Sequence, residues 1–103
     1  MSGETFTVGS LIFKDGVSEK IKMQILESLA EAIEVEVSDL HYNIYSGQWS
    51  FQSINWQSHV EKEGIENFLK NRKGFIKRFV CSLHYLTDPE QINYHEETKK
   101  KEE

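Results

Sequence analysis

Four histidines and a single cysteine are among the side chains of this sequence with the chemistry for metal binding or nucleophilic catalysis. Neutral imidazole and thiolate are common zinc ligands, and a thiolate beside an imidazole can act as a nucleophile. The histidines do not recur at the four-residue interval that places two ligands on one helix face, and we expect His41 and His84 to lie on opposite edge strands of a sheet. The sequence therefore predicts no metal site. The histidines are His41, His59, His84 and His95, and the cysteine is Cys81.

Cys81 stands between Val80 and Ser82 in a stretch that predicts a strand. As the single cysteine it excludes an intrachain disulfide and a cysteine-based metal cluster. His84 follows three residues later, on the opposite face of a strand, so it cannot activate the thiol. The sequence also has no glycine-rich phosphate loop and no nucleophile elbow. These residues favour a non-catalytic protein, without metal or cofactor, over an enzyme.

The length of 103 residues and the acidic balance narrow the class of protein. We expect one globular α+β domain over residues 1–95 and a charged tail, EETKKKEE, over residues 96–103. A net charge of −5 disfavours non-specific nucleic-acid binding, which depends on Lys and Arg contacts with phosphate. No apolar run follows a basic start, and no window reaches the ~18 apolar residues of a membrane helix. We therefore expect a cytoplasmic protein without a membrane partner.

The periodicity of the apolar residues predicts four strands and two helices. Ser18 is positioned to cap the first helix, and Ser58 begins an S-x-x-E capping box for the second. Gly47 allows a short hairpin between the second and third strands. Ile92 and Tyr94 either add a short fifth strand or lie on the surface. The expected strands cover residues 5–13, 40–45, 49–57 and 75–86, and the expected helices cover residues 18–33 and 58–73.

The order strand, helix, strand, strand, helix, strand predicts a ferredoxin-like (split β-α-β) sandwich. Such a domain has a four-stranded antiparallel sheet, in the order 4-1-3-2, with two helices on one face. Its other sheet face is open. Because this architecture supports many unrelated functions, the function has to be sought in its surfaces.

The stretch IYSGQWSFQSINWQ, residues 44–57, places both tryptophans in the third strand. Trp49 and Phe51 have one parity, and Ile54 and Trp56 have the other. A β-bulge at residues 52–53 would put all four side chains on one face. Without a bulge, one aromatic pair faces the helices and the other faces outward.

Aromatic side chains on the open face would form an apolar contact surface. Their neighbours there would be Leu11, Phe13 and Tyr45. Trp and Tyr are enriched among the residues that contribute most to protein–protein binding. The first strand is apolar in both parities near its end, which favours a sheet covered on both faces by a second subunit or a partner.

A glutamate stripe lies opposite the apolar face of the first helix. Glu27, Glu31 and Glu34 form it, with Glu36 and Asp39 nearby. Residues 18–39 contain six acidic residues and two lysines. Glu27 and Glu31 are four residues apart and repel each other by about 0.2–0.5 kcal/mol. The stripe is either a solvated helix face or a field that steers a basic partner into contact.

Three functions are compatible with these features. The first is a non-catalytic protein-binding domain, such as a small acidic inhibitor, an immunity-type protein or an adaptor. Its partner would be a protein, basic where the glutamate stripe takes part, or a second copy of the chain. The candidate contact residues are Glu27, Glu31, Glu34, Tyr45, Trp49, Phe51 and Trp56.

The second function is a homodimer whose sheets face each other around a small-molecule pocket, as a binding protein or a simple enzyme. His41, Tyr45, Trp49 and His84 would line that pocket. The third is single-stranded RNA binding on the sheet, because RNA-recognition domains share this topology and stack bases on sheet aromatics. The segment SGQWSF has no basic residue and its aromatics are displaced from that family's positions, so nucleic acid is the least favoured partner.

Overall fold

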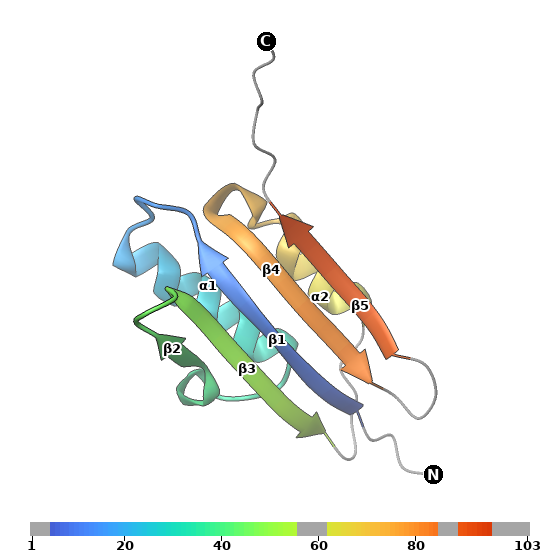
Figure 1. The fold of residues 1–103 in the computed structure, drawn as a ribbon. Helices are drawn as coiled ribbons and strands as arrows, with labels where there is room; N and C mark the ends of the chain where they lie inside the picture. The colour runs from blue at the N-terminus through green and yellow to red at the C-terminus, as the bar shows by residue number, and fades with distance from the viewer. Residues whose placement is uncertain (1–4, 56–61, 85–88, 96–103) are drawn as a thin grey trace.

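The computed structural model describes residues 5–55, 62–84 and 89–95, which form an α+β domain with a five-stranded antiparallel sheet and two α-helices. Figure 1 shows both helices on the same face of the sheet. Neither described α-helix is long and apolar enough to cross a membrane. The sheet order is β2-β3-β1-β4-β5. The elements are β1 (Thr5–Phe13), α1 (Glu19–Ala32), the 3₁₀ helix η1 (Val37–Asp39), β2 (His41–Asn43), β3 (Gln48–Asn55), α2 (Lys62–Lys70), the 3₁₀ helix η2 (Lys73–Phe75), β4 (Ile76–His84) and β5 (Pro89–His95).

The sheet confirms the predicted α+β class with an antiparallel sheet and two helices, but the prediction of four strands is wrong. Strand β5 pairs antiparallel with β4 along all seven of its residues. Ile92 lies opposite Cys81 and is buried, whereas Gln91 and Asn93 on either side of it are exposed. The sequence signal for this strand is weak because Ile92 is the one buried residue among residues 90–95 and both of its neighbours are polar.

Helix α1 begins where the sequence predicts. The Ser18 side-chain Oγ accepts a hydrogen bond from the Ile21 N–H at 3.2 Å, which satisfies one of the free N–H groups of the first turn. The helix buries its apolar stripe against the sheet and α2. Glu34 then takes a left-handed conformation, with φ of 61°, and ends the helical segment. The buried residues of α1 are Ile25, Leu26, Leu29 and Ala30, and Ile33 follows them into the core.

The core lies between the helices and one parity of β1. Leu11 is fully buried and Phe13 is nearly so, while Ile12 between them lies on the open face and is half-buried. The alternative that placed Leu11 and Phe13 on the open face is therefore wrong. Leu11 lies opposite Phe79 of β4, whose ring packs against Phe68 of α2 with centroids 5.8 Å apart. The helix layer thus decides which parity of this doubly apolar strand is buried.

Strand β3 has no bulge at residues 52–53, so of the two alternatives the regular strand is the one observed. Its register with β1 runs unbroken from Thr5↔Asn55 to Leu11↔Trp49. Phe51 is buried and Trp49 is half-buried against the core, so both face the helices and not the open face. Trp56 lies outside the described residues.

Candidate protein-binding surface on the β2–β3 hairpin

The three most exposed large apolar side chains of the described residues lie on one hairpin. Tyr42 is 51% exposed, Ile44 73% and Tyr45 94%. We call these three residues the hairpin patch. Strand β2 ends at Asn43, so Ile44 and Tyr45 belong to the turn and not to the half-buried strand that the alternation of residues 40–45 predicted.

The turn that carries the hairpin patch has a fixed backbone. The Asn43 side-chain Oδ1 accepts hydrogen bonds from the N–H groups of Tyr45, at 2.8 Å, and Ser46, at 3.2 Å. The Gly47 N–H donates to the Asn43 carbonyl oxygen at 2.8 Å. Gly47 has a φ of 70°, the left-handed region in which glycine has no steric cost. These bonds hold the exposed side chains on an ordered loop, and the local Asn side chain is the kind that stabilises such turns.

Tyr42 connects the patch to the core. Its ring lies 5.0 Å from the ring of Trp49, its cross-strand partner, at an interplanar angle of 43°. Trp49 packs in turn against the buried cluster under the sheet. Trp49 therefore joins the exposed Tyr42 ring to the core. Tyr42 covers the Trp49 ring at the edge of the sheet.

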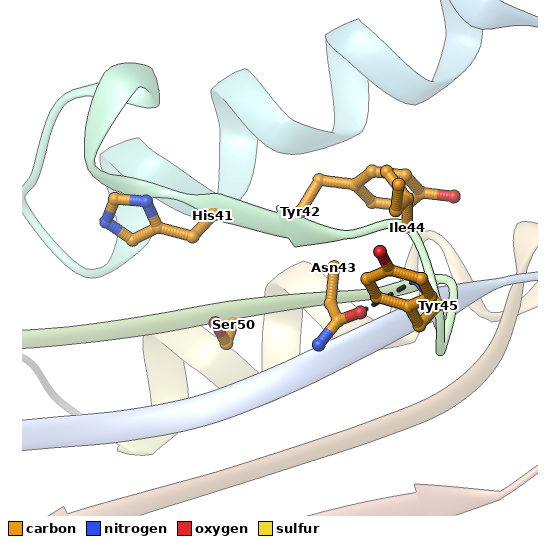
Figure 2. Close-up of a pocket in the computed structure, with 6 residues that line it drawn as sticks. All are labelled: His41, Tyr42, Asn43, Ile44, Tyr45 and Ser50. Atoms are coloured by element: carbon orange, nitrogen blue, oxygen red, sulfur yellow. Dashed lines mark hydrogen bonds between the residues drawn. The ribbon is translucent and has the colours of Figure 1, made fainter.

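A shallow hollow of about 390 Å³ lies at this hairpin. Figure 2 shows the residues that line it. The ring of Tyr42 and the side chain of Ile44 lie on one side of β2, and the Asn43 amide lies on the other side near Tyr45. The surface thus offers apolar groups together with amide and imidazole hydrogen-bonding groups. The hollow is lined by His41, Tyr42, Asn43, Ile44, Tyr45 and Ser50.

The predicted glutamate stripe is exposed. Glu27 and Glu31 lie on the outer face of α1, and Glu34 lies just beyond its end. Glu36 and Asp39 have a local structural role, because the Asp39 Oδ2 accepts a hydrogen bond from the Glu36 N–H at 3.0 Å and caps η1. The stripe and the hairpin patch are both available to a partner.

The structure brings few of the other candidate residues together. His41 and Tyr45 line the same hollow, but the Trp49 side chain lies on the face of the sheet that the helices cover. His84 is three strands away from His41, on β4, and its ring lies 5.8 Å from that of Phe6. The four residues expected to line a pocket between facing sheets therefore do not form one surface.

Tyr42 and Ile44 were not among the predicted contact residues. They belong to the more apolar parity of the half-buried strand that was expected over residues 40–45, in which Leu40, Tyr42 and Ile44 alternate with polar residues and Tyr45. The signal that would have found them is Asn43 followed four residues later by Gly47, a pair of turn-forming residues that ends the strand early. Phe51, by contrast, was proposed as a contact residue and is core.

The nucleophile candidate is not poised for chemistry. Cys81 is buried at the centre of β4, and burial raises the pKa of its thiol to about 12, so the reactive thiolate is disfavoured at neutral pH. Within residues 5–55, 62–84 and 89–95, no three His, Cys, Asp or Glu side chains come close enough to hold a metal ion.

The described chain is thus an α+β domain with an antiparallel sheet, two helices on one face and an apolar hairpin at one sheet edge. Comparison with protein-family models, with curated proteins and with solved structures gives no match in any of the three. The function of this chain therefore has to be inferred from its surfaces.

Proposed function

We propose that this chain is a non-catalytic protein-binding domain that contacts its partner through the hairpin patch. The observation that carries the proposal is the exposure of Tyr42 in β2 and of Ile44 and Tyr45 on the turn that follows it, whose backbone is hydrogen-bonded. Isolated apolar residues on a surface are ordinary, but these three lie within four positions of one hairpin and line the same hollow.

The chemistry of the patch suits a protein partner. Tyrosine combines a large apolar ring with a hydroxyl and loses little conformational entropy on binding, and it is enriched among binding hot spots. Because the turn is already ordered by Asn43, binding would not have to fix the backbone. The shallow hollow beside Tyr45 fits a protruding side chain of a partner better than an enclosed small molecule.

We propose that the partner has a basic surface, separate from the part that contacts the hairpin patch. Glu27 and Glu31 are exposed on α1 and carry like charges four residues apart. Such a field increases the association rate with a positively charged protein and is screened by salt. A small inhibitor, an immunity-type protein or an adaptor would use a surface of this kind.

We also propose that the domain is ferredoxin-like, extended by one strand. The order β2-β3-β1-β4 and the two helices on one face support this assignment. Strand β5 would then be an addition at the β4 edge.

A pair of matched variants tests the hairpin patch. Ile44→Ser with Tyr45→Ser removes two exposed apolar side chains, and Met23→Ser removes an exposed apolar side chain, 46% exposed, from α1. Each protein would carry a photo-crosslinking group at Ser46 and be mixed with extract of its native cells. We expect one crosslinked protein with the wild type and Met23→Ser, and its loss with the hairpin variant.

The thermal midpoints of all three proteins provide the control for folding. If the hairpin variant, folded to the same extent, captured the same protein in the same amount, the proposed surface would be wrong. Glu27→Lys with Glu31→Lys tests the steering separately, because it should slow association at low salt and leave dissociation unchanged.

A further inference from the structure

The two edges of the sheet differ in how they are protected from pairing with another chain. A free strand edge exposes unpaired N–H and C=O groups, and proteins protect such edges with short strands, lysines, prolines or bulges. The β2 edge has a strand of three residues, whereas β5 at the other edge has seven. Strand β5 has no lysine, pairs with β4 without a bulge, and has its one proline at the first position, Pro89.

We propose that β5 pairs antiparallel with β5 of a second copy of this chain. The two Ile92 residues would face each other across the two-fold axis. This register pairs all seven residues of each strand, because Ile92 is the midpoint of Pro89–His95. A shift in either direction would leave residues of both strands unpaired. The dimer is isologous, so every contact occurs twice.

Charge complementarity supports the same register. With Ile92 opposite itself, Glu90 lies directly opposite Tyr94 of the second copy. Directly opposite residues have their Cβ atoms about 4.5–5.5 Å apart. The Lys73 Nζ lies 5.2 Å from the centre of the Tyr94 ring in the same chain. The exposed Glu90 carboxylate of each copy is thereby brought next to the Lys73 ammonium of the other.

The remaining pairs contain no like charges. Gln91 lies opposite Asn93 of the second copy, and both are neutral and exposed. A groove of about 540 Å³, lined by residues of α2, η2 and β5, runs beside this edge. A two-fold axis perpendicular to the sheet keeps the helices of both copies on one face, so the two grooves meet at the junction. The helical residues that line the groove are Glu66, Leu69 and Lys70 of α2 and Lys73 of η2.

This dimer uses the edge opposite to the hairpin patch. The sheets of the two copies would join through β5, and each β2–β3 hairpin would lie at a far end. Self-association and the proposed partner binding are therefore independent, and the failure of one leaves the other intact.

Charge substitutions at Gln91 and Asn93 test the pairing and its register. Gln91→Lys with Asn93→Lys places two like-charged pairs across the junction, whereas Gln91→Lys with Asn93→Glu places an ammonium opposite a carboxylate in both pairs. The side chains of these residues are exposed in β5, so the fold tolerates the changes. The mass of each protein would be measured by sedimentation equilibrium over about a hundredfold range of concentration.

We expect the wild type to approach twice the 12.1 kDa mass of the chain as its concentration rises. The double-lysine variant should raise the dissociation constant about tenfold or more, and the lysine–glutamate variant should return it to the wild-type value or below. A wild type that stays monomeric throughout would overturn the proposal. So would a dimer that the double-lysine variant leaves unchanged, or a lysine–glutamate variant that is as weak as the double-lysine one.

Discussion

Gly9 of β1 lies directly opposite Phe51 of β3, and the ring of Phe51 occupies the space that a side chain of Gly9 would need. A Cβ placed on Gly9 would lie 2.7 Å from the Phe51 Cζ and would overlap the Val80 carbonyl oxygen. Phe51 reaches across the sheet to Phe79, with ring centroids 6.2 Å apart. The absence of a side chain at Gly9 therefore allows β3 and β4 to share a ring contact across β1.

Gly9→Ala should destabilise the protein because the new methyl group displaces the Phe51 ring or separates the strands. We expect the free energy of unfolding to fall by about 1–3 kcal/mol, as in other overpacked cores. Gly64→Ala is the matched control: its Cβ meets open space within α2, and it should stabilise by about 0.5–1 kcal/mol. Chemical denaturation of both variants measures the difference, and equal values would contradict the packing argument.

Substitutions at Trp49 and Tyr45 should have different effects on the free energy of unfolding, because Trp49 packs on the core and Tyr45 is exposed. Trp49→Ala removes a ring that packs on the core and on Tyr42, so we expect a loss of about 2–4 kcal/mol in the free energy of unfolding. Tyr45→Ala should change that free energy by less than about 0.5 kcal/mol, because the side chain is 94% exposed. A large destabilisation by Tyr45→Ala would show that this residue is structural.

Arg72 should stabilise the contact between α1 and α2. Its Nη2 donates to the Ser28 Oγ at 3.0 Å, its Nη1 donates to the Phe68 carbonyl oxygen at 3.1 Å, and its guanidinium lies 5.1 Å from the centre of the Phe68 ring. Arg72→Lys loses this fork of donors, and we expect a destabilisation of about 1–2 kcal/mol. A double-mutant cycle with Ser28→Ala measures the share of the Ser28 bond, expected at about 0.5–1.5 kcal/mol. Additive effects of the two substitutions would contradict the coupling.

The Cys81 thiol should make stability decrease at alkaline pH. Burial raises its pKa from 9.0 to about 12, so its contribution is fully present below pH 9 and is lost as the pH rises toward about 12. In this window the unfolded chain releases a proton that the folded chain retains, which costs about 1.4 kcal/mol per pH unit. Urea titrations across the window should show a steeper decline for the wild type than for Cys81→Ala.

The same burial should make the thiol slow to react. A disulfide reagent should modify the native protein at a rate that increases with added urea, because the thiol is reached through opening of the sheet. Fast modification without denaturant, or identical alkaline slopes for wild type and Cys81→Ala, would contradict the raised pKa.

Local features of the fold could be predicted from the sequence. Ser18 caps α1, Gly47 takes a positive φ in the hairpin, and the periodic apolar residues of α1 face the core, because each of these depends on residues close together in the chain. The order of the elements and the α+β class follow from such local signals. The glutamates of the stripe are also exposed where the helical period places them.

The candidate site was predicted only in part. Tyr45 was identified, but Tyr42 and Ile44 were placed in a half-buried strand and not among the contact residues, and Phe51 was proposed as a contact residue. The difference arises because the exposure of a strand residue depends on where the strand ends and on which face the helices cover. Neither is encoded within the strand.

What the sequence determined by itself is the set of helices, turns and most strands, since their hydrogen bonds and caps join near neighbours. Only the tertiary structure decided which alternate residues of β1 are buried, that β5 pairs with β4, and which residues of the hairpin are exposed. Leu11, Ile12 and Phe13 are all apolar, so alternation cannot say which of them is buried until α2 packs Phe68 against Phe79. Contacts between residues far apart in the chain make that choice, and they also leave Ile44 and Tyr45 in solvent.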